Sequence, residues 1–193
     1  MAYTERFEEA LAHAARLHKT QTRKGSETPY INHLLAVAAI VGENGGTEDE
    51  VIAALLHDAI EDTDETKESL SERFGENVAE IVEGCSDADA IPKPPWKVRK
   101  ETYIAHIKTA PPSALVVSSA DKLHNARSIL SDYREVGEGL WSRFRGGREG
   151  TLWYYRALVE AYESVGSSPV IEEFERVVEE IETLAGEGRG VGI

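Results

Sequence analysis

The chain has 193 residues, a formal net charge of −14 at neutral pH and an apolar fraction of 41%. This apolar share is too high for a disordered chain, and the length suits one domain with a sizeable core. The acidic charge argues against a binder of nucleic-acid polymers, because such binders gain affinity by neutralising phosphates with Lys and Arg. A small phosphorylated ligand is still allowed, provided that positive charge is concentrated where it binds.

The sequence also indicates where the protein works. Cys85 is the only cysteine, which excludes an intramolecular disulfide and fits a reducing cytoplasm. The first ten residues lack the apolar core of a signal peptide, and no apolar run reaches the length of a membrane span. We therefore expect a cytoplasmic protein that does not enter a membrane.

Helical periodicity dominates the chain, and no alternating strand pattern is evident. Thr4 and Thr47 stand where two helices should begin, as N-caps. The predicted helices span residues 4–18, 31–44, 48–63, 67–74, 76–87, 96–108, 113–130, 149–165 and 170–184. The sequence thus predicts an all-α, single-domain bundle of roughly 8–11 helices over residues 1–185, followed by a flexible tail at residues 186–193.

Four ionisable side chains end the apolar run Val51–Ile60 or follow it closely: His57, Asp58, Glu61 and Asp62. On one continuous helix these positions span roughly 140° and can face a single cavity. A buried, unpaired carboxylate costs several kcal/mol, and a metal ion would compensate His57 and Asp58 together. The alternative is a helix end whose charges simply reach solvent, and this segment alone does not decide between them.

Two other apolar helices each carry an imidazole or a carboxylate. His33 lies near the start of the second predicted helix, and Asp121 follows an apolar stretch in a later one. A single histidine on an apolar face is more often a core residue than a ligand. Together with His57 and Asp58, however, these residues offer two nitrogens and two carboxylates, which suits a first-row metal site with room for water.

The order of these motifs resembles a known family. A histidine, then a His-Asp pair, then a distant aspartate is similar to the HD superfamily of metal-dependent phosphohydrolases. Longer segments resemble the hydrolase domain of RelA/SpoT proteins, and the length is closest to the small alarmone hydrolases of the animal SpoT homologue type. The matching segments are Arg23-Lys24, Pro29–His33, Ala54–Asp58, Glu61–Thr63 and Ala120–Asn125, within a resemblance from about Phe7 to about Tyr162.

This resemblance implies an HD-type helical bundle with Mn²⁺ as cofactor, although the ligand types alone also allow Fe, Zn or another first-row ion. It further implies hydrolysis of the 3′-pyrophosphate of a (p)ppGpp-type alarmone, which releases pyrophosphate and GDP or GTP, or the adenine equivalents. Two alternatives stay open. One is an HD-type phosphohydrolase of another nucleotide, such as a 5′-nucleotidase, and the other is a nucleotide-sensing domain without turnover.

Roles for individual residues follow from position and resemblance. Glu61 and Asp62, one turn after the His-Asp pair, could orient a water or move its proton. Loop residues Arg23 and Lys24 could donate to a pyrophosphate, and Arg23 could instead stack on a base. Asn125 suits a ribose hydroxyl or a base edge. The predicted substrate-binding residues are Arg23, Lys24, Lys122, Asn125, Arg143 and Tyr154.

Other polar features are assigned more ordinary roles. Residues 141–148 combine three arginines and two aromatics with two glycines, which is typical of a mobile, anion-facing flap or an exposed interaction loop. His13, His18 and His106 lack convergent acidic partners in sequence, so we expect them to be structural. Glu65 and Glu68, beyond the predicted catalytic acids, should be exposed.

Overall fold

The structure is a computed structural model that describes residues 2–86 and 94–187. Within these ranges the chain forms ten α-helices and one 3₁₀ helix, and an isolated bridge between Thr22 and Pro29 is the only β pairing there. The predicted all-α class is confirmed, and the helix count lies within the expected range. None of these helices is long and apolar enough to cross a membrane.

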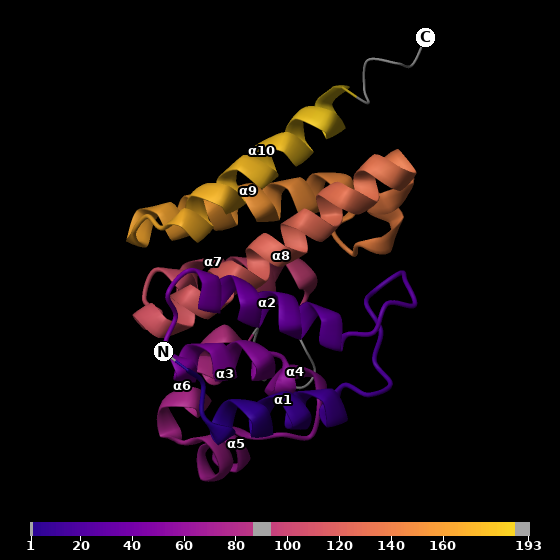
Figure 1. The fold of residues 1–193 in the computed structure, drawn as a ribbon. Helices are drawn as coiled ribbons and strands as arrows, with labels where there is room; N and C mark the ends of the chain where they lie inside the picture. The colour runs from indigo at the N-terminus through magenta and orange to yellow at the C-terminus, as the bar shows by residue number, and fades with distance from the viewer. Residues whose placement is uncertain (1, 87–93, 188–193) are drawn as a thin grey trace. The chain divides into compact units, whose positions relative to one another are not determined.

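The elements follow one another as labelled in Figure 1. Their bounds are α1 Glu5–Leu17, α2 Ile31–Glu43, α3 Glu48–Leu56, α4 Ala59–Asp62, α5 Lys67–Phe74, α6 Glu76–Cys85, α7 Trp96–Ile107, α8 Pro112–Val136, η1 Gly137–Arg143, α9 Gly147–Val165 and α10 Pro169–Glu187. The helix α10 runs into the predicted tail as far as Glu187. The rest of that tail, and residues 91–93 of a proline-rich connection, lie outside the described residues.

The chain divides into two compact units. The first comprises Met1–Asp89 and Ala110–Asp121, and the second comprises Ala90–Thr109 and Lys122–Ile193. The long helix α8 contributes its first turns to one unit and the remainder to the other. A single domain over residues 1–185 stays a prediction.

The helix α3 is the centre of the first unit. It packs against α1, α2 and α6, and α5 packs on α6. Every residue from Val51 to Leu56 is at most 2% exposed, so α3 is buried on all sides. Apolar burial stabilises a fold by roughly 25 cal/mol per Å², so this helix is a rigid support for the polar residues that follow it.

Local hydrogen bonds determine where α1 and α3 begin. The Thr4 side chain accepts from the Arg6 amide. The Thr47 side chain accepts from the Glu50 amide, while the Glu50 carboxylate accepts from the Thr47 amide. This capping box satisfies two amides that a helix start leaves unpaired. Both predicted N-caps are confirmed.

The single helix predicted over residues 48–63 is wrong, because the chain breaks at His57 and Asp58. Asp58 has φ −98° and ψ 0°, and the one-turn helix α4 follows it. His57 Nδ1 donates to the Ala54 carbonyl at 2.8 Å, the group that the next amide would use in a continuous helix. The angle of roughly 140° that was calculated for one continuous helix therefore does not apply. The turn at His57 and Asp58 determines where the four ionisable side chains point.

In the second unit, α9 packs against α10, α7 and η1. Arg127 and Arg134 of α8 form ion pairs with Glu173 and Glu180 of α10. The two arginines are seven residues apart on α8, and the two glutamates are seven residues apart on α10, which is two helical turns in each case. These stretches of α8 and α10 therefore lie along one another.

Residues 141–148 are partly packed, since Trp141 is buried whereas Ser142 and Arg145 are exposed, and their role as a flap or an interaction loop stays a prediction. Leu140 is fully buried and Trp141 is 5% exposed. Arg143 donates to an aspartate of α8 at 3.0 Å, and Arg148 donates to a backbone carbonyl of α10. The sequence did not indicate this packing because a short 3₁₀ helix buries its apolar residues without the period of an α-helix.

Leu34 and Leu35, neighbours on α2, offer a matched test of the first core. Leu34 is fully buried, whereas Leu35 is 41% exposed. We expect Leu34→Ala to lower the free energy of unfolding by about 2–5 kcal/mol, because a cavity remains. Leu35→Ala should lower it by less than about 1 kcal/mol. Denaturant titration of the metal-free protein measures both, and equal losses would contradict this core assignment.

Candidate metal centre

Three elements of the first unit bring imidazoles and carboxylates together. His33 lies in the first turn of α2, His57 and Asp58 lie in the break after α3, and Asp121 lies on α8. His33 Nε2 is 3.1 Å from Asp121 Oδ1 and 3.8 Å from Asp58 Oδ2. His57 Nε2 is 3.1 Å from Asp58 Oδ2 and 3.7 Å from Asp121 Oδ1. The four predicted ligands therefore surround one small space.

His57 presents its ring in the form that a metal needs. Its Nδ1 donates to the Ala54 carbonyl, so in the neutral ring the lone pair is on Nε2. In this neutral form the buried Nε2 has no hydrogen-bond partner, because its polar neighbours are the carboxylate oxygens of Asp58 and Asp121, which cannot donate. The potential ligand atoms of His33, His57 and Asp58 lie within 4.8 Å of one another. A buried atom without a hydrogen bond is costly, and a divalent cation coordinated here would satisfy it.

The electrostatics of these residues favour a cation. Burial opposes charge on His57, but Asp58 and Asp121 outweigh it and raise the pKa of His57 well above its ordinary value. Burial also opposes charge on Asp58, yet His57 holds the pKa of this carboxyl below its usual range. Burial lowers the pKa of His33 against the pull of Asp121. The carboxylates thus stabilise positive charge in the space between them, and a divalent ion bound there would supply that charge.

Tyr30 orients one of these carboxylates, and sequence reasoning missed it. Its hydroxyl donates to Asp58 Oδ2 at 2.6 Å, and its ring meets the His33 ring edge-on at 5.4 Å. Burial, with a contribution from Asp58, raises the pKa of Tyr30, so the hydroxyl keeps its proton and stays a donor. The spacing of three residues between Tyr30 and His33 was a signal, but aromatic residues at such positions usually serve the core.

Asp62, one of the two predicted catalytic acids on α4, is held by a chain of contacts. Its Oδ2 accepts from Gln21 Nε2 at 2.7 Å, and Gln21 Oε1 lies 2.6 Å from His18 Nδ1. The His18 ring stacks on Tyr30 at 5.4 Å. The loop that precedes α2 therefore contacts both Asp62 and the tyrosine that orients Asp58. Gln21 was missed because nothing distinguishes it within a polar loop.

Glu61 and Asp62 also line an open hollow of about 620 Å³, together with Arg16 of α1. Glu61 is half-buried and Asp62 is exposed. Both acids can therefore meet water and a ligand that enters from solvent.

Two predicted substrate residues, Arg23 and Lys24, lie in the loop before α2. The Arg23 amide donates to the Thr28 carbonyl at 2.8 Å, which closes the loop on itself. The Arg23 guanidinium lies 5.8 Å from the centre of the Tyr30 ring. Lys24 is exposed. The loop thus places the positive charge of Arg23 next to the tyrosine that contacts the predicted ligands, and it carries Lys24 at the following position.

The other four predicted substrate residues belong to the second unit. Lys122 Nζ lies 4.7 Å from the centre of the Tyr103 ring. Arg143 pairs with an aspartate of α8, Tyr154 is buried and Asn125 is half-buried. They are distributed over α8, η1 and α9, and their role in substrate binding stays a prediction.

Comparison with protein families gives one decisive match. The HD domain model aligns with residues 10–152, well over half of the chain. The chain belongs to the HD domain family. This membership and the His-His-Asp cluster together imply a divalent metal ion.

Curated relatives carry a specific name. The guanosine-3′,5′-bis(diphosphate) 3′-pyrophosphohydrolase MESH1 of Xenopus tropicalis is 44% identical over 140 residues, which cover 71% of this chain and 74% of that protein. The human protein of the same name is 41% identical over the same shares. A solved structure of a metazoan orthologue of SpoT, described as hydrolysing ppGpp, matches with a TM-score of 0.78. It covers 94% of this chain and 98% of the other at 24% identity, and it confirms the HD-type fold.

The metal site can be tested by removing ligands and their support separately. We expect His57→Ala and Asp121→Ala to abolish binding of a divalent metal. At a hundredfold excess of metal over its dissociation constant, each variant would lose about 2.7 kcal/mol of linked stability. Tyr30→Phe should keep the metal but weaken its affinity about 10- to 100-fold, since only the support of Asp58 is lost.

Elemental analysis and calorimetric titration measure these effects. His106→Ala, at an exposed histidine of α7, is the matched control and should leave metal binding unchanged. Full occupancy in both ligand variants would refute the site.

Proposed function

We propose that this protein is a Mn²⁺-dependent hydrolase of the 3′-pyrophosphate of a (p)ppGpp-type alarmone, and that it releases pyrophosphate and GDP or GTP, or the adenine equivalents. The observation that carries the proposal is the convergence of His33, His57, Asp58 and Asp121. It occurs in a chain 44% identical to a named 3′-pyrophosphohydrolase. We further propose that the enzyme acts in the cytoplasm on a free nucleotide.

Neighbouring groups hold two of the proposed metal ligands in place. A divalent ion held there would polarise a phosphoryl oxygen and lower the pKa of a water. His57 is fixed through the Ala54 carbonyl and Asp58 through the Tyr30 hydroxyl. Because both side chains are held by neighbours, little reorganisation is needed when the reacting groups arrive.

Glu61 and Asp62 are assigned to proton transfer. They follow the ligand pair by one turn, and they line the hollow beside α4. A carboxylate within hydrogen-bonding distance of the attacking water can orient it and accept its proton, and a protonated acid can return a proton to the leaving 3′ oxygen. Gln21 holds one oxygen of Asp62, which fixes the orientation of that carboxylate.

Substrate binding requires local positive charge, because the chain as a whole carries −14. Arg23 and Lys24 supply two such charges in one short loop. An arginine can donate two parallel hydrogen bonds to a phosphate, or it can stack on a base. The proposed substrate-binding set is Arg23, Lys24, Lys122, Asn125, Arg143 and Tyr154.

One assay separates this proposal from its rivals. The Mn²⁺-loaded protein is incubated with ppGpp, ppApp and a set of nucleoside 5′-monophosphates, and pyrophosphate and orthophosphate are measured. Release of pyrophosphate from an alarmone supports the proposal. Release of orthophosphate from monophosphates alone would favour a nucleotidase, and tight binding of ppGpp without turnover would favour a sensing domain.

The roles of the two acids give a sharper test. Glu61→Gln and Asp62→Asn should retain the metal and lose about 10²- to 10⁴-fold in kcat, the usual cost of removing a general acid or base. Asp64→Asn, at an exposed acid that lines the same hollow, should keep near-normal activity. Near-normal turnover in both Glu61→Gln and Asp62→Asn would place proton transfer elsewhere.

Base selection gives a further test. An arginine stacked on a ring treats guanine and adenine alike, whereas hydrogen bonds to the base edge distinguish them. We therefore expect Arg23→Ala to reduce kcat/KM for ppGpp and ppApp by similar factors. Changes at Ser26, Glu27 or Asn125 should instead alter the ratio of the two. A large change in this ratio from Arg23→Ala alone would contradict the stacking role.

A further inference from the structure

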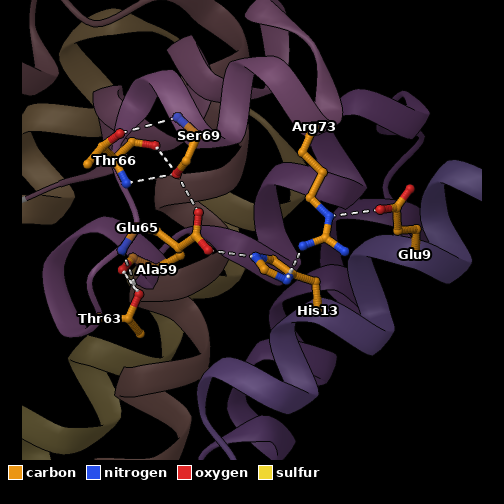
Figure 2. Close-up of polar contacts among 8 residues, drawn as sticks. All are labelled: Glu9, His13, Ala59, Thr63, Glu65, Thr66, Ser69 and Arg73. Atoms are coloured by element: carbon orange, nitrogen blue, oxygen red, sulfur yellow. Dashed lines mark hydrogen bonds and ion pairs between the residues drawn. The ribbon is translucent and has the colours of Figure 1, made fainter.

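A second polar network lies in the first unit and contains neither the proposed metal ligands nor the proposed catalytic acids. Figure 2 shows how it connects α1, the segment after α4 and α5. Glu9 and His13 come from α1, Glu65 comes from the segment after α4, and Ser69 and Arg73 come from α5. We call these five residues the His13 network. The expectation that Glu65 is exposed was wrong, because its side chain is largely buried, and His13 has an acidic partner that the sequence did not indicate.

The hydrogen bonds of the network define the protonation of His13. Arg73 Nη1 lies 2.8 Å from His13 Nδ1, and because a guanidinium only donates, Nδ1 must accept. The ring proton is therefore on Nε2, which lies 3.0 Å from Glu65 Oε1 and donates to it. Burial, and next the charge of Arg73, lower the pKa of His13, in agreement with a neutral ring.

Glu65 is fixed on both of its carboxylate oxygens. His13 donates to Oε1, and the Ser69 hydroxyl donates to Oε2 at 2.5 Å. The side chains of His13 and Glu65 are 8% and 17% exposed. At the other end of the network, Arg73 bonds to Glu9 at 2.7 Å nearer to solvent. Removing either donor from a buried carboxylate destabilises the folded protein, because the carboxylate oxygen is left without its hydrogen bond.

The backbone of Glu65 is tied directly to α4. The Thr63 hydroxyl donates to the Ala59 carbonyl at 2.6 Å and accepts from the Glu65 amide at 3.2 Å. One hydroxyl thus joins the first residue of α4 to the residue that the His13 network holds. Glu61 and Asp62 lie between these two attachment points.

A helix as short as α4 depends on such attachments. A single hydrogen-bonded turn is unfavourable on its own, because several dihedral angles are fixed for very few hydrogen bonds. The four residues of α4 therefore need contacts from other elements to hold their conformation. Packing on α6 supplies some of these contacts, Gln21 supplies one at Asp62, and Glu65 supplies another at the end of the segment.

We propose that His13 and Glu65 are positioning residues that hold the one-turn helix α4, and with it the carboxylates of Glu61 and Asp62, in place for proton transfer. This inference rests on the proposed function for the role of the two acids. The attachment of α4 to α1 and α5 does not depend on which reaction the protein catalyses.

Leucine and glutamine substitutions at the same positions distinguish a positioning role from a general loss of stability. His13→Leu removes the donor to Glu65 and the acceptor from Arg73, whereas His13→Gln keeps one donor and one acceptor on a neutral side chain. Glu65→Leu and Glu65→Gln form the same kind of pair. Thr47→Ala removes the cap of α3, whose hydrogen bonds are with Glu50 and not with a residue of the network, and it is the control for lost stability.

The experiment measures kcat, KM, metal affinity and melting temperature for each Mn²⁺-loaded variant, together with amide hydrogen exchange in a peptide spanning residues 59–66. Both leucine variants should lose roughly 10- to 100-fold in kcat, because small displacements of catalytic groups are costly. Their KM and metal affinity should change less than about twofold, and exchange in residues 59–66 should rise. Both glutamine variants should restore most of the activity and of the protection.

Each contrary result has a distinct meaning. If the leucine variants keep the kcat of Thr47→Ala at equal folded fraction, the network is merely structural and the positioning role is overturned, while the proposed function stands. If the unmodified protein releases no pyrophosphate from ppGpp, the proposed function fails instead. Hydrogen exchange then decides the structural claim alone, and unchanged exchange in His13→Leu would overturn it as well.

Discussion

The hydrogen bond from His57 Nδ1 to the Ala54 carbonyl is the interaction on which the rest of the site depends. It occupies the carbonyl that would extend α3, and the helix ends there. In the neutral ring it also places the proton on Nδ1, so that Nε2, close to the carboxylates of Asp58 and Asp121, carries the lone pair that a metal ion needs. A single contact thus gives the backbone its turn and gives the imidazole its chemical form.

Apolar packing supports the turn on its N-terminal side, and side-chain hydrogen bonds support it on its C-terminal side. Residues Val51–Leu56 of α3 are almost wholly inaccessible, so the point at which the chain leaves this helix is fixed by packing. Beyond that point, polar contacts take over. Tyr30 holds Asp58, Gln21 holds Asp62, and Glu65 holds the end of the segment. The most rigid part of the unit therefore adjoins the part that relies most on side-chain hydrogen bonds.

Much of the fold could be predicted from sequence because it depends on local patterns. Apolar periodicity located the helices, and Thr4 and Thr47 marked two of their starts. The residues that converge at His33, His57, Asp58 and Asp121 were also identified, since their types and order carry a chemical signature. The break at His57 was missed because a side chain competes there with the backbone. Glu65 and Gln21 were missed because their partners are distant in sequence, and only tertiary packing brings them together.

The continuity of α8 limits how such a chain can change its length. Asp121 and Lys122 are consecutive in one uninterrupted helix, yet one is assigned to the metal and the next to the substrate. Their Cα atoms are therefore about 3.8 Å apart by covalent geometry alone. Inserting one residue between them would rotate everything downstream by about 100° about the helix axis and advance it by about 1.5 Å. An insertion there would change which side chain follows Asp121 along the helix, whereas a substitution would leave the backbone of α8 unchanged.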